Sequence, residues 1–356
     1  MTKLGIERRS SDLGQGWSWP VSRRTMLGAI CAAFALWVAP VSPTAAQDVK
    51  VAKLGHSFAD SHPRAAAVKF FAEEVEKATN GSVTVTVFGN AALGSEEKML
   101  IALQSGTIDF YMGSLAPIAT HKKELQIFDI PFLFENEEQA AAVLDGPAGT
   151  DLLASLSDMR MHGLVWSGGA MRNLSNSQHP VATLADMEGL KVRVMQSPMA
   201  LASFKALGMN AVPMAFTEVY TALETKALDG YEHPFVDMYA NNMYEVQEYL
   251  TVTNHVYTPV ALVASSKFWD SLTPEQQAAV QSAAEKTRTF QREAEDRDAA
   301  EALGKLEAEG METTVMQPAD IEAVRAAIEP VVTENIDVIG RDFVERFYAE
   351  IAANKN

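Results

Sequence analysis

Cysteine is almost absent from this sequence. Among its 356 residues the single cysteine is Cys31, which lies in an apolar segment near the N-terminus. If that segment is removed on export, the remaining chain has no thiol. This excludes disulfides, thiolate metal ligands and cysteine nucleophiles, so the hydrophobic core alone must stabilise the protein.

Positive charge is also scarce. The chain has 29 Lys and Arg against 46 Asp and Glu, a net charge of −17. The first 46 residues carry five basic and two acidic side chains, net +3, so the rest of the chain is near −20. Such a charge argues against binding to nucleic acids or anionic membranes. Any site for an anion must therefore depend on a few well-placed arginines.

Long hydrophobic runs are missing as well. The apolar run at 26–39, about 14 residues, is too short to cross a bilayer and is typical of a signal peptide. Small residues at 44–46 predict that residues 1–46 are a signal peptide cleaved before Gln47. The segment 22–27, Ser-Arg-Arg-Thr-Met-Leu, resembles the twin-arginine export motif, with the general secretory route as the alternative.

Hydrophobic periodicity predicts an α/β fold. A strand at 49–55, a helix at 64–78 and a strand at 83–87 form one β-α-β unit with a right-handed crossover. The remaining residues, roughly 310, suffice for two domains. Further helices are expected at 96–104, 143–156, 198–207 and 217–228, and further strands at 108–112, 161–166, 190–194, 209–213, 249–254 and 259–264.

One helix is expected to be unusually long. Thr273-Pro274-Glu275-Gln276 has the pattern of a capping box with proline at the first helical position, and no break follows before Gly310. A helix of about 36 residues would be about 54 Å long, which exceeds the width of one domain. We therefore expect it to span both domains.

The domain boundaries follow from the expected crossings of the chain. Domain I is predicted to comprise 47–169 and 258–297, and domain II 170–257 and 298–356. The pair Gly168-Gly169 at the first crossing is a candidate hinge, because glycine tolerates changes of φ and ψ most easily.

Arg193 lies in an apolar strand that begins a β-α-β-α segment, 190–234. A buried arginine needs water or a partner, and its planar guanidinium matches a carboxylate with two hydrogen bonds. From the residues alone, either a structural ion pair or an anion site satisfies this need. Ligands of such parallel sheets bind at the carboxyl ends of the strands.

The same segment resembles a known family. Gly-Leu-Lys-Val-Arg-Val at 189–194, Gln-Ser-Pro at 196–198, Pro-Met-Ala-Phe-Thr-Glu-Val-Tyr at 213–220 and Asp-Gly-Tyr-Glu at 229–232 are similar to the pattern of the solute-binding proteins of TRAP transporters, the DctP family. The resemblance implies a hinged, two-domain periplasmic binding protein fold of type II-like topology. It also implies a periplasmic monomer without a cofactor, which captures a small organic acid anion and delivers it to TRAP membrane permease subunits.

The resemblance also implies the binding residues. Arg193 and Arg172 would bind the ligand carboxylate, Phe216 would lie under its carbon chain, and Gln196 would be a neutral contact. His233 stands where many members have asparagine; when protonated it would add charge and tighten anion binding as the pH falls. The far end of the ligand is expected to meet a set of polar residues of the first domain: His56, Ser57, His62, Glu96 and Ser114.

Several alternatives stay open. A C4-dicarboxylate, a sugar acid or another hydroxy or keto acid would each suit two arginines. A periplasmic hydrolase or lyase acting through His233 with Glu232 is the enzymatic alternative, although no Gly-x-Ser-x-Gly, P-loop or dinucleotide motif accompanies it. A binding protein that serves only a signalling receptor is a third hypothesis.

Overall fold

The structure is a computed structural model that describes residues 49–355. The expected signal peptide, its cleavage point before Gln47 and Cys31 lie outside the described residues. None of the described helices is both long enough and apolar enough to cross a membrane.

The described strands form one mixed nine-stranded sheet in the order β2-β1-β3-β8-β4-β7-β5-β6, with β9 beside β8. The pairs at both ends of the sheet are parallel, whereas β8 is antiparallel to β3 and to β4, and β4 is antiparallel to β7. The strands are β1 (Lys50–Gly55), β2 (Val83–Phe88), β3 (Phe110–Gly113), β4 (Met161–Asn176), β5 (Lys191–Val194), β6 (Asn210–Pro213), β7 (Gly230–His233), β8 (Tyr249–Ser265) and β9 (Glu312–Val315).

Local sequence signals explain where several helices begin. Ser95 and Ser197 accept backbone N–H groups at the starts of α2 and α5, and Thr273 with Gln276 forms the expected capping box at α9. The helices are α1 (Pro63–Ala78), α2 (Glu96–Ser105), α3 (Glu137–Asp145), α4 (Pro147–Ala154), α5 (Pro198–Ala206), α6 (Val219–Glu224), α7 (Phe235–Ala240), α8 (Ser266–Trp269), α9 (Pro274–Ala308), α10 (Pro318–Ile339) and α11 (Arg341–Ala353).

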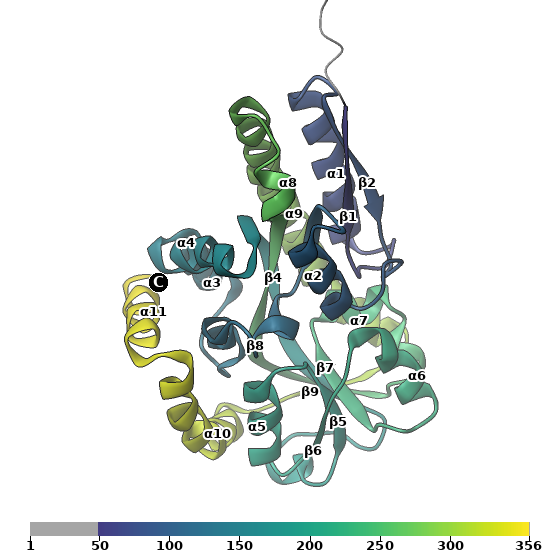
Figure 1. Ribbon diagram of the computed structural model, residues 1–356. Coiled ribbons are helices and arrows are strands. Elements are labelled where there is room, and N and C mark those ends of the chain that lie inside the picture. The colour runs from purple at the N-terminus through teal and green to yellow at the C-terminus, as the bar shows by residue number, and fades with distance from the viewer. Residues whose placement is uncertain (1–48, 356) are drawn as a thin grey trace, which may run out of the picture. The chain divides into compact units, whose positions relative to one another are not determined.

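Two long antiparallel strands, β4 and β8, connect the two halves of the sheet (Figure 1). The first half contains β1, β2 and β3, and the second half contains β5, β6 and β7. The sequence predicted only parts of these strands. The strand expected at 161–166 continues as β4 through the candidate hinge, and the two strands expected at 249–254 and 259–264 form the single strand β8. At Gly168 an added Cβ would lie 2.2 Å from Oε2 of Glu295, and at Gly169 2.5 Å from the ring of Tyr257. Close packing therefore requires both glycines, and a hinge role stays a prediction.

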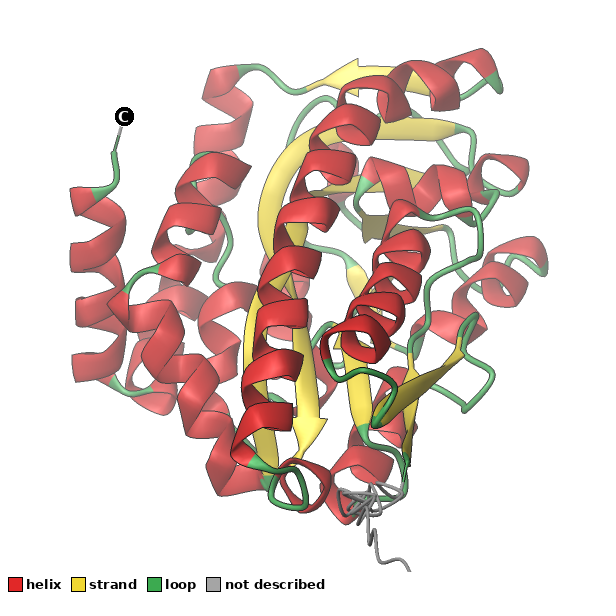
Figure 2. Ribbon diagram, turned by 90° about the horizontal axis from the view of Figure 1, so that it is seen from above, coloured by secondary structure: helices red, strands yellow, loops and turns green. Residues whose placement is uncertain are grey.

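The long helix α9 has 35 residues, close to the expected length. It runs across the sheet (Figure 2) and packs against α1 of the first half, α7 of the second half and β4 between them. The prediction of a long helix spanning both parts is confirmed.

Other expected boundaries were wrong. The single helix predicted at 143–156 is broken, because Gly146 ends α3 and Pro147 begins α4. The helix predicted at 217–228 is shorter, since α6 ends at Glu224.

The C-terminal helix α11 belongs to the segment 298–356 that was assigned to domain II, but it packs against the first half of the molecule. Its residues Val344, Phe347 and Ile351 share a hydrophobic cluster with Phe128 and Trp166 of the first half. In Figure 1 it lies beside α3 and α4.

Candidate functional site

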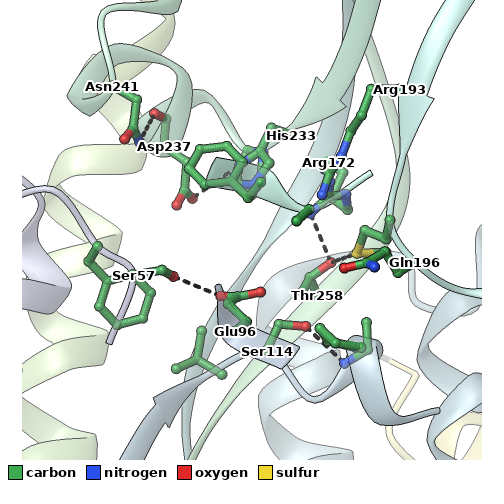
Figure 3. A pocket seen from close by; sticks show the side chains of 18 of the residues that line it. Ser57, Glu96, Ser114, Arg172, Arg193, Gln196, His233, Asp237, Asn241 and Thr258 are labelled. Carbon is green, nitrogen blue, oxygen red and sulfur yellow. Dashed lines mark hydrogen bonds and ion pairs between the residues drawn. The ribbon is translucent and has the colours of Figure 1, made fainter. Parts of the chain in front are cut away.

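A polar pocket of about 770 Å³, part of it open to solvent, lies between the two halves of the sheet (Figure 3). It contains every binding residue that the sequence predicted except His56 and His62. Its walls are formed by Ser57, Phe58, Arg64, Glu96, Ser114, Ala116, Pro117, Arg172, Arg193, Met195, Gln196, Ala215, Phe216, His233, Pro234, Asp237, Asn241, Thr258 and Val260.

Arg172 on β4 is paired with a protein carboxylate. Its guanidinium contacts both carboxylate oxygens of Glu232 on β7, with Nη2 2.8 Å from Oε1, and also donates to the Glu232 carbonyl at 2.6 Å. Burial acts to raise the pKa of Glu232, but Arg172 and His255 outweigh it and hold this pKa at about 2. Glu232 is therefore ionised and neutralises Arg172, whose Nη1 reaches Thr258 Oγ1 at 3.4 Å.

Arg193 on β5 is also buried, but it has no carboxylate partner. It is 5% exposed, its Nε donates to the Met214 carbonyl at 2.9 Å, and its Nη1 is buried without a hydrogen-bond partner. It forms no ion pair with any described residue. Burial lowers the pKa of Arg193 to about 10, which still leaves it cationic at neutral pH. The pocket therefore holds a buried cation that no carboxylate of the described residues contacts directly, although the charges of Glu232 and Glu96 act on it from a distance.

His233 ends β7 and lies beside Phe216, with 4.7 Å between the ring centroids. Burial and the nearby charge of Arg172 lower the pKa of His233 to about 3. The imidazole is therefore neutral at physiological pH. The low pKa argues against the expectation that it gains a proton between pH 8 and 6, which stays a prediction; as a neutral ring it can still donate one hydrogen bond.

The wall contributed by the first half is rich in acceptors. Ser57 donates to Glu96 Oε1 at 2.8 Å, and burial raises the pKa of Glu96. Ser114 accepts the Ala116 N–H at 3.2 Å. On the other wall, Gln196 Nε2 lies 3.5 Å from Glu97 Oε2, a contact between the two halves of the molecule.

His56 does not line the pocket. It is 1% exposed, its ring stacks on Phe58 at 5.3 Å, and a Cβ at Gly89 would lie 2.8 Å from it. Burial lowers the pKa of His56 to about 4. Its position behind Phe58 is that of a packed core histidine.

A charged cluster that was not predicted from the sequence lies at one end of the pocket. Arg64 of α1 donates to Glu295 Oε1 at 2.5 Å and to both oxygens of Asp237 at 3.3 and 3.2 Å. Arg64 lies three and seven residues before Ala67 and Phe71 on the buried face of α1, so helical periodicity could have indicated that it is buried. Asn241 and Thr258 were also missed, and no local signal marks them.

Among the described residues, no group of three or more His, Cys, Asp and Glu side chains could hold a metal ion. The arrangement of a free guanidinium, a neutral imidazole, an aromatic ring and several acceptors suits the binding of a small anion with polar substituents.

A sheet whose halves are joined by two long strands, with a polar pocket between them, defines a two-domain periplasmic binding protein. The chain belongs to the bacterial extracellular solute-binding proteins of family 7, DctP, whose sequence profile matches residues 54–337. Members of this TRAP transporter family are binding proteins, and the chain is not an enzyme.

Three relatives illustrate the family. The sugar acid binding protein DctPAm of Advenella mimigardefordensis, solved with galactonate, is 40% identical with a TM-score of 0.84 over 86% of this chain and 100% of its own. A TRAP periplasmic solute binding protein of Polaromonas, bound to D-erythronate, is 32% identical with a TM-score of 0.81 over 84% and 98%. The C4-dicarboxylate-binding periplasmic protein DctP of Rhodobacter capsulatus is 36% identical over 253 residues, 70% of this chain and 74% of that protein.

Proposed function

We propose that this protein captures a small organic acid anion and that Arg193 binds its carboxylate. The observation that supports this is the buried guanidinium of Arg193, which has no counter-ion among the described residues. An unpaired buried charge is costly, and an incoming carboxylate would offset that cost with two hydrogen bonds. Arg172 would contribute through Nη1, since Glu232 holds the rest of its guanidinium.

We further propose that the ligand carries one carboxylate and several hydroxyls, as a sugar acid does. Among the described residues lining the pocket, Arg64 and Arg172 already have carboxylate partners, which leaves Arg193 as the cation without one. The relatives solved with galactonate and D-erythronate hold ligands of this kind. The named ligand of the Rhodobacter relative makes a C4-dicarboxylate the second candidate.

Titration calorimetry with D-galactonate and D-erythronate tests this proposal. Wild type should bind at least one of them, and Arg193→Gln should weaken binding at least about thirtyfold, because losing one partner of a buried charged pair costs on the order of 2–5 kcal/mol. Arg346→Gln is the matched control, since its side chain is 67% exposed and lies outside the pocket. Affinity within threefold of wild type in Arg193→Gln would contradict the proposal.

We propose that binding closes two domains, 47–169 with 258–297 and 170–257 with 298–340, and that the C-terminal helix α11 moves with the first domain, against which it packs. Pocket residues come from both, so a bound ligand favours the arrangement in which both contact it. Small-angle scattering should give a smaller radius of gyration with saturating ligand. Identical scattering curves for a preparation shown to bind would contradict closure.

We propose a periplasmic location, reached by the twin-arginine route, and delivery of the ligand to TRAP membrane subunits. The periplasmic names of the relatives support the location. Deleting the gene should abolish uptake of the radiolabelled ligand, and wild type should restore it whereas Arg193→Gln should not. Unchanged uptake after deletion would favour a protein that serves only a signalling receptor.

A further inference from the structure

Asp237 lies at the end of the pocket away from the two arginines. It belongs to the short helix α7, is 5% exposed and lines the pocket. In Figure 3, Asp237 and Asn241 lie on the opposite side of His233 from Arg172 and Arg193. The pocket therefore has a cationic end and an end that contains a buried carboxylate.

Asp237 is held by groups from the other half of the molecule. Nη1 of Arg64 lies 3.3 and 3.2 Å from its two oxygens, and Nε2 of His62 lies 3.3 Å from Oδ1. Nδ1 of His62 accepts the backbone N–H of Arg64 at 3.0 Å, so the proton of a neutral ring is on Nε2 and faces Asp237. The Asp237 carboxylate is thus held by hydrogen bonds from Arg64, and the His62 ring nitrogen lies at ion-pair distance without a hydrogen bond of good geometry.

The position of Arg64 is fixed in turn. Its Nε donates to Oε1 of Glu295 on α9, which also accepts a hydrogen bond from Gln291 at 3.1 Å. Burial alone would raise the pKa of Asp237, but Arg64, His62 and His233 together hold this pKa well below its ordinary value. Asp237 therefore remains ionised, and two carboxylates, Asp237 and Glu295, share the single charge of Arg64.

An ionised carboxylate can only accept hydrogen bonds, and it has about four acceptor positions. Arg64 uses one position on each oxygen, and His62 approaches only Oδ1. Nδ1 of His233 is 3.7 Å from Oδ2, too far for a hydrogen bond, so Oδ2 keeps a free acceptor position. A ligand hydroxyl can donate to the position that remains. A ligand carboxylate there would be repelled, since no unpaired cation of the described lining lies at this end.

We propose that Asp237 is a specificity-determining residue that accepts a hydrogen bond from the terminal hydroxyl of a sugar acid and rejects a second carboxylate. The inference rests on the proposed function, in which Arg193 binds the first carboxylate. It assigns to one residue the choice between monocarboxylate and dicarboxylate ligands of equal length.

Matched ligand pairs test the inference. D-galactonate and galactarate have the same carbon chain and differ only at C6, a hydroxymethyl group or a carboxylate; D-erythronate and meso-tartrate are the corresponding four-carbon pair. By calorimetry, wild type should prefer the monocarboxylate at least about a hundredfold, because like charges in contact repel strongly. Asp237→Asn, whose amide can donate, should reduce this preference at least about tenfold.

The control variant is Asp145→Asn, which removes a carboxylate that pairs with Arg288 and Arg292 outside the pocket. It should keep the wild-type preference. A preference in Asp237→Asn within threefold of wild type would overturn the inference. If no acid of either pair binds wild type, the proposed function fails and this inference falls with it; equal binding of both members of a pair overturns only the role of Asp237.

A second measurement needs no variant and so does not depend on Asp237→Asn folding. D-fuconate is D-galactonate without the hydroxyl on C6. Because a site that accepts a hydrogen bond from a hydroxyl discriminates against an analogue lacking it, wild type should bind D-fuconate at least about tenfold more weakly. Equal affinity for the two acids would overturn the inference.

Discussion

Arg172 and Arg193 reach the same pocket from the same sheet but in different electrostatic states. Both are buried, at 2% and 5% exposure, yet Arg172 has a complete carboxylate partner and Arg193 has none. The strand β7 lies between β4 and β5 and explains the difference. It brings Glu232 to Arg172, whereas Arg193 pairs in register with Tyr231, which supplies no charge. A buried arginine is therefore a binding candidate only when its neighbours leave it unneutralised.

The largest expected effect is on stability. Arg172→Met leaves the ionised Glu232 buried without its main partner, and should lower the free energy of unfolding by about 3–5 kcal/mol. Arg193→Met removes a buried cation that has no direct carboxylate partner, and should raise the free energy of unfolding by about 1 kcal/mol or more. Urea denaturation of the two variants measures both. Equal losses would mean that the two arginines do not differ as described.

The next effect is on affinity. Arg193→Lys keeps the charge but loses the planar guanidinium, so calorimetry should show binding of D-galactonate weakened by about thirtyfold or more, roughly 2 kcal/mol. The circular dichroism spectrum should match that of wild type. Unchanged affinity would show that the guanidinium geometry of Arg193 is not used.

A smaller effect concerns Asp129, which lies near the Arg172–Glu232 pair and accepts a hydrogen bond from Ser197 at 2.5 Å. Burial raises the pKa of Asp129 to about 7. Between about pH 4 and 7 the folded protein therefore keeps a proton on Asp129 that the unfolded chain has released. The free energy of unfolding falls over this range, and the contribution present at low pH is gone once the pH has risen through 7. Each pH unit in this window corresponds to about 1.4 kcal/mol.

Asp129→Asn removes this titration. Its free energy of unfolding relative to wild type should rise by about 2–3 kcal/mol from pH 5 to pH 7 and change little above pH 8. Urea denaturation at four pH values measures the difference. A difference that does not vary with pH would show that Asp129 is ionised throughout.

The smallest expected effect is at His233. With a pKa of about 3, this imidazole stays neutral from pH 5.5 to 8. The ratio of wild-type to His233→Asn affinity for D-galactonate should therefore be constant over that range, because neither side chain ionises. A ratio that changes tenfold would mean that the bound anion raises this pKa into the measured window.

Local features of the sequence determined many elements. The β-α-β unit of β1, α1 and β2, the start of α5 at Ser197 and the whole of α9 followed from periodicity and caps, since these depend on contacts within a few residues. The family pattern of residues also indicated most of the pocket, including Arg193, Phe216 and His233.

Only the tertiary structure decided the chemistry of the pocket. Glu232 neutralises Arg172 across 60 residues, and Asp237 meets Arg64 across 173, so no local pattern could pair them. The same holds for His56. The sequence placed it in the site, but it packs against Phe58 and Gly89 and is buried behind the pocket wall. The sequence by itself determined which charged residues lie on which elements. The fold decided which of those charges are neutralised, because burial and distance between remote segments set the electrostatic energy of each one.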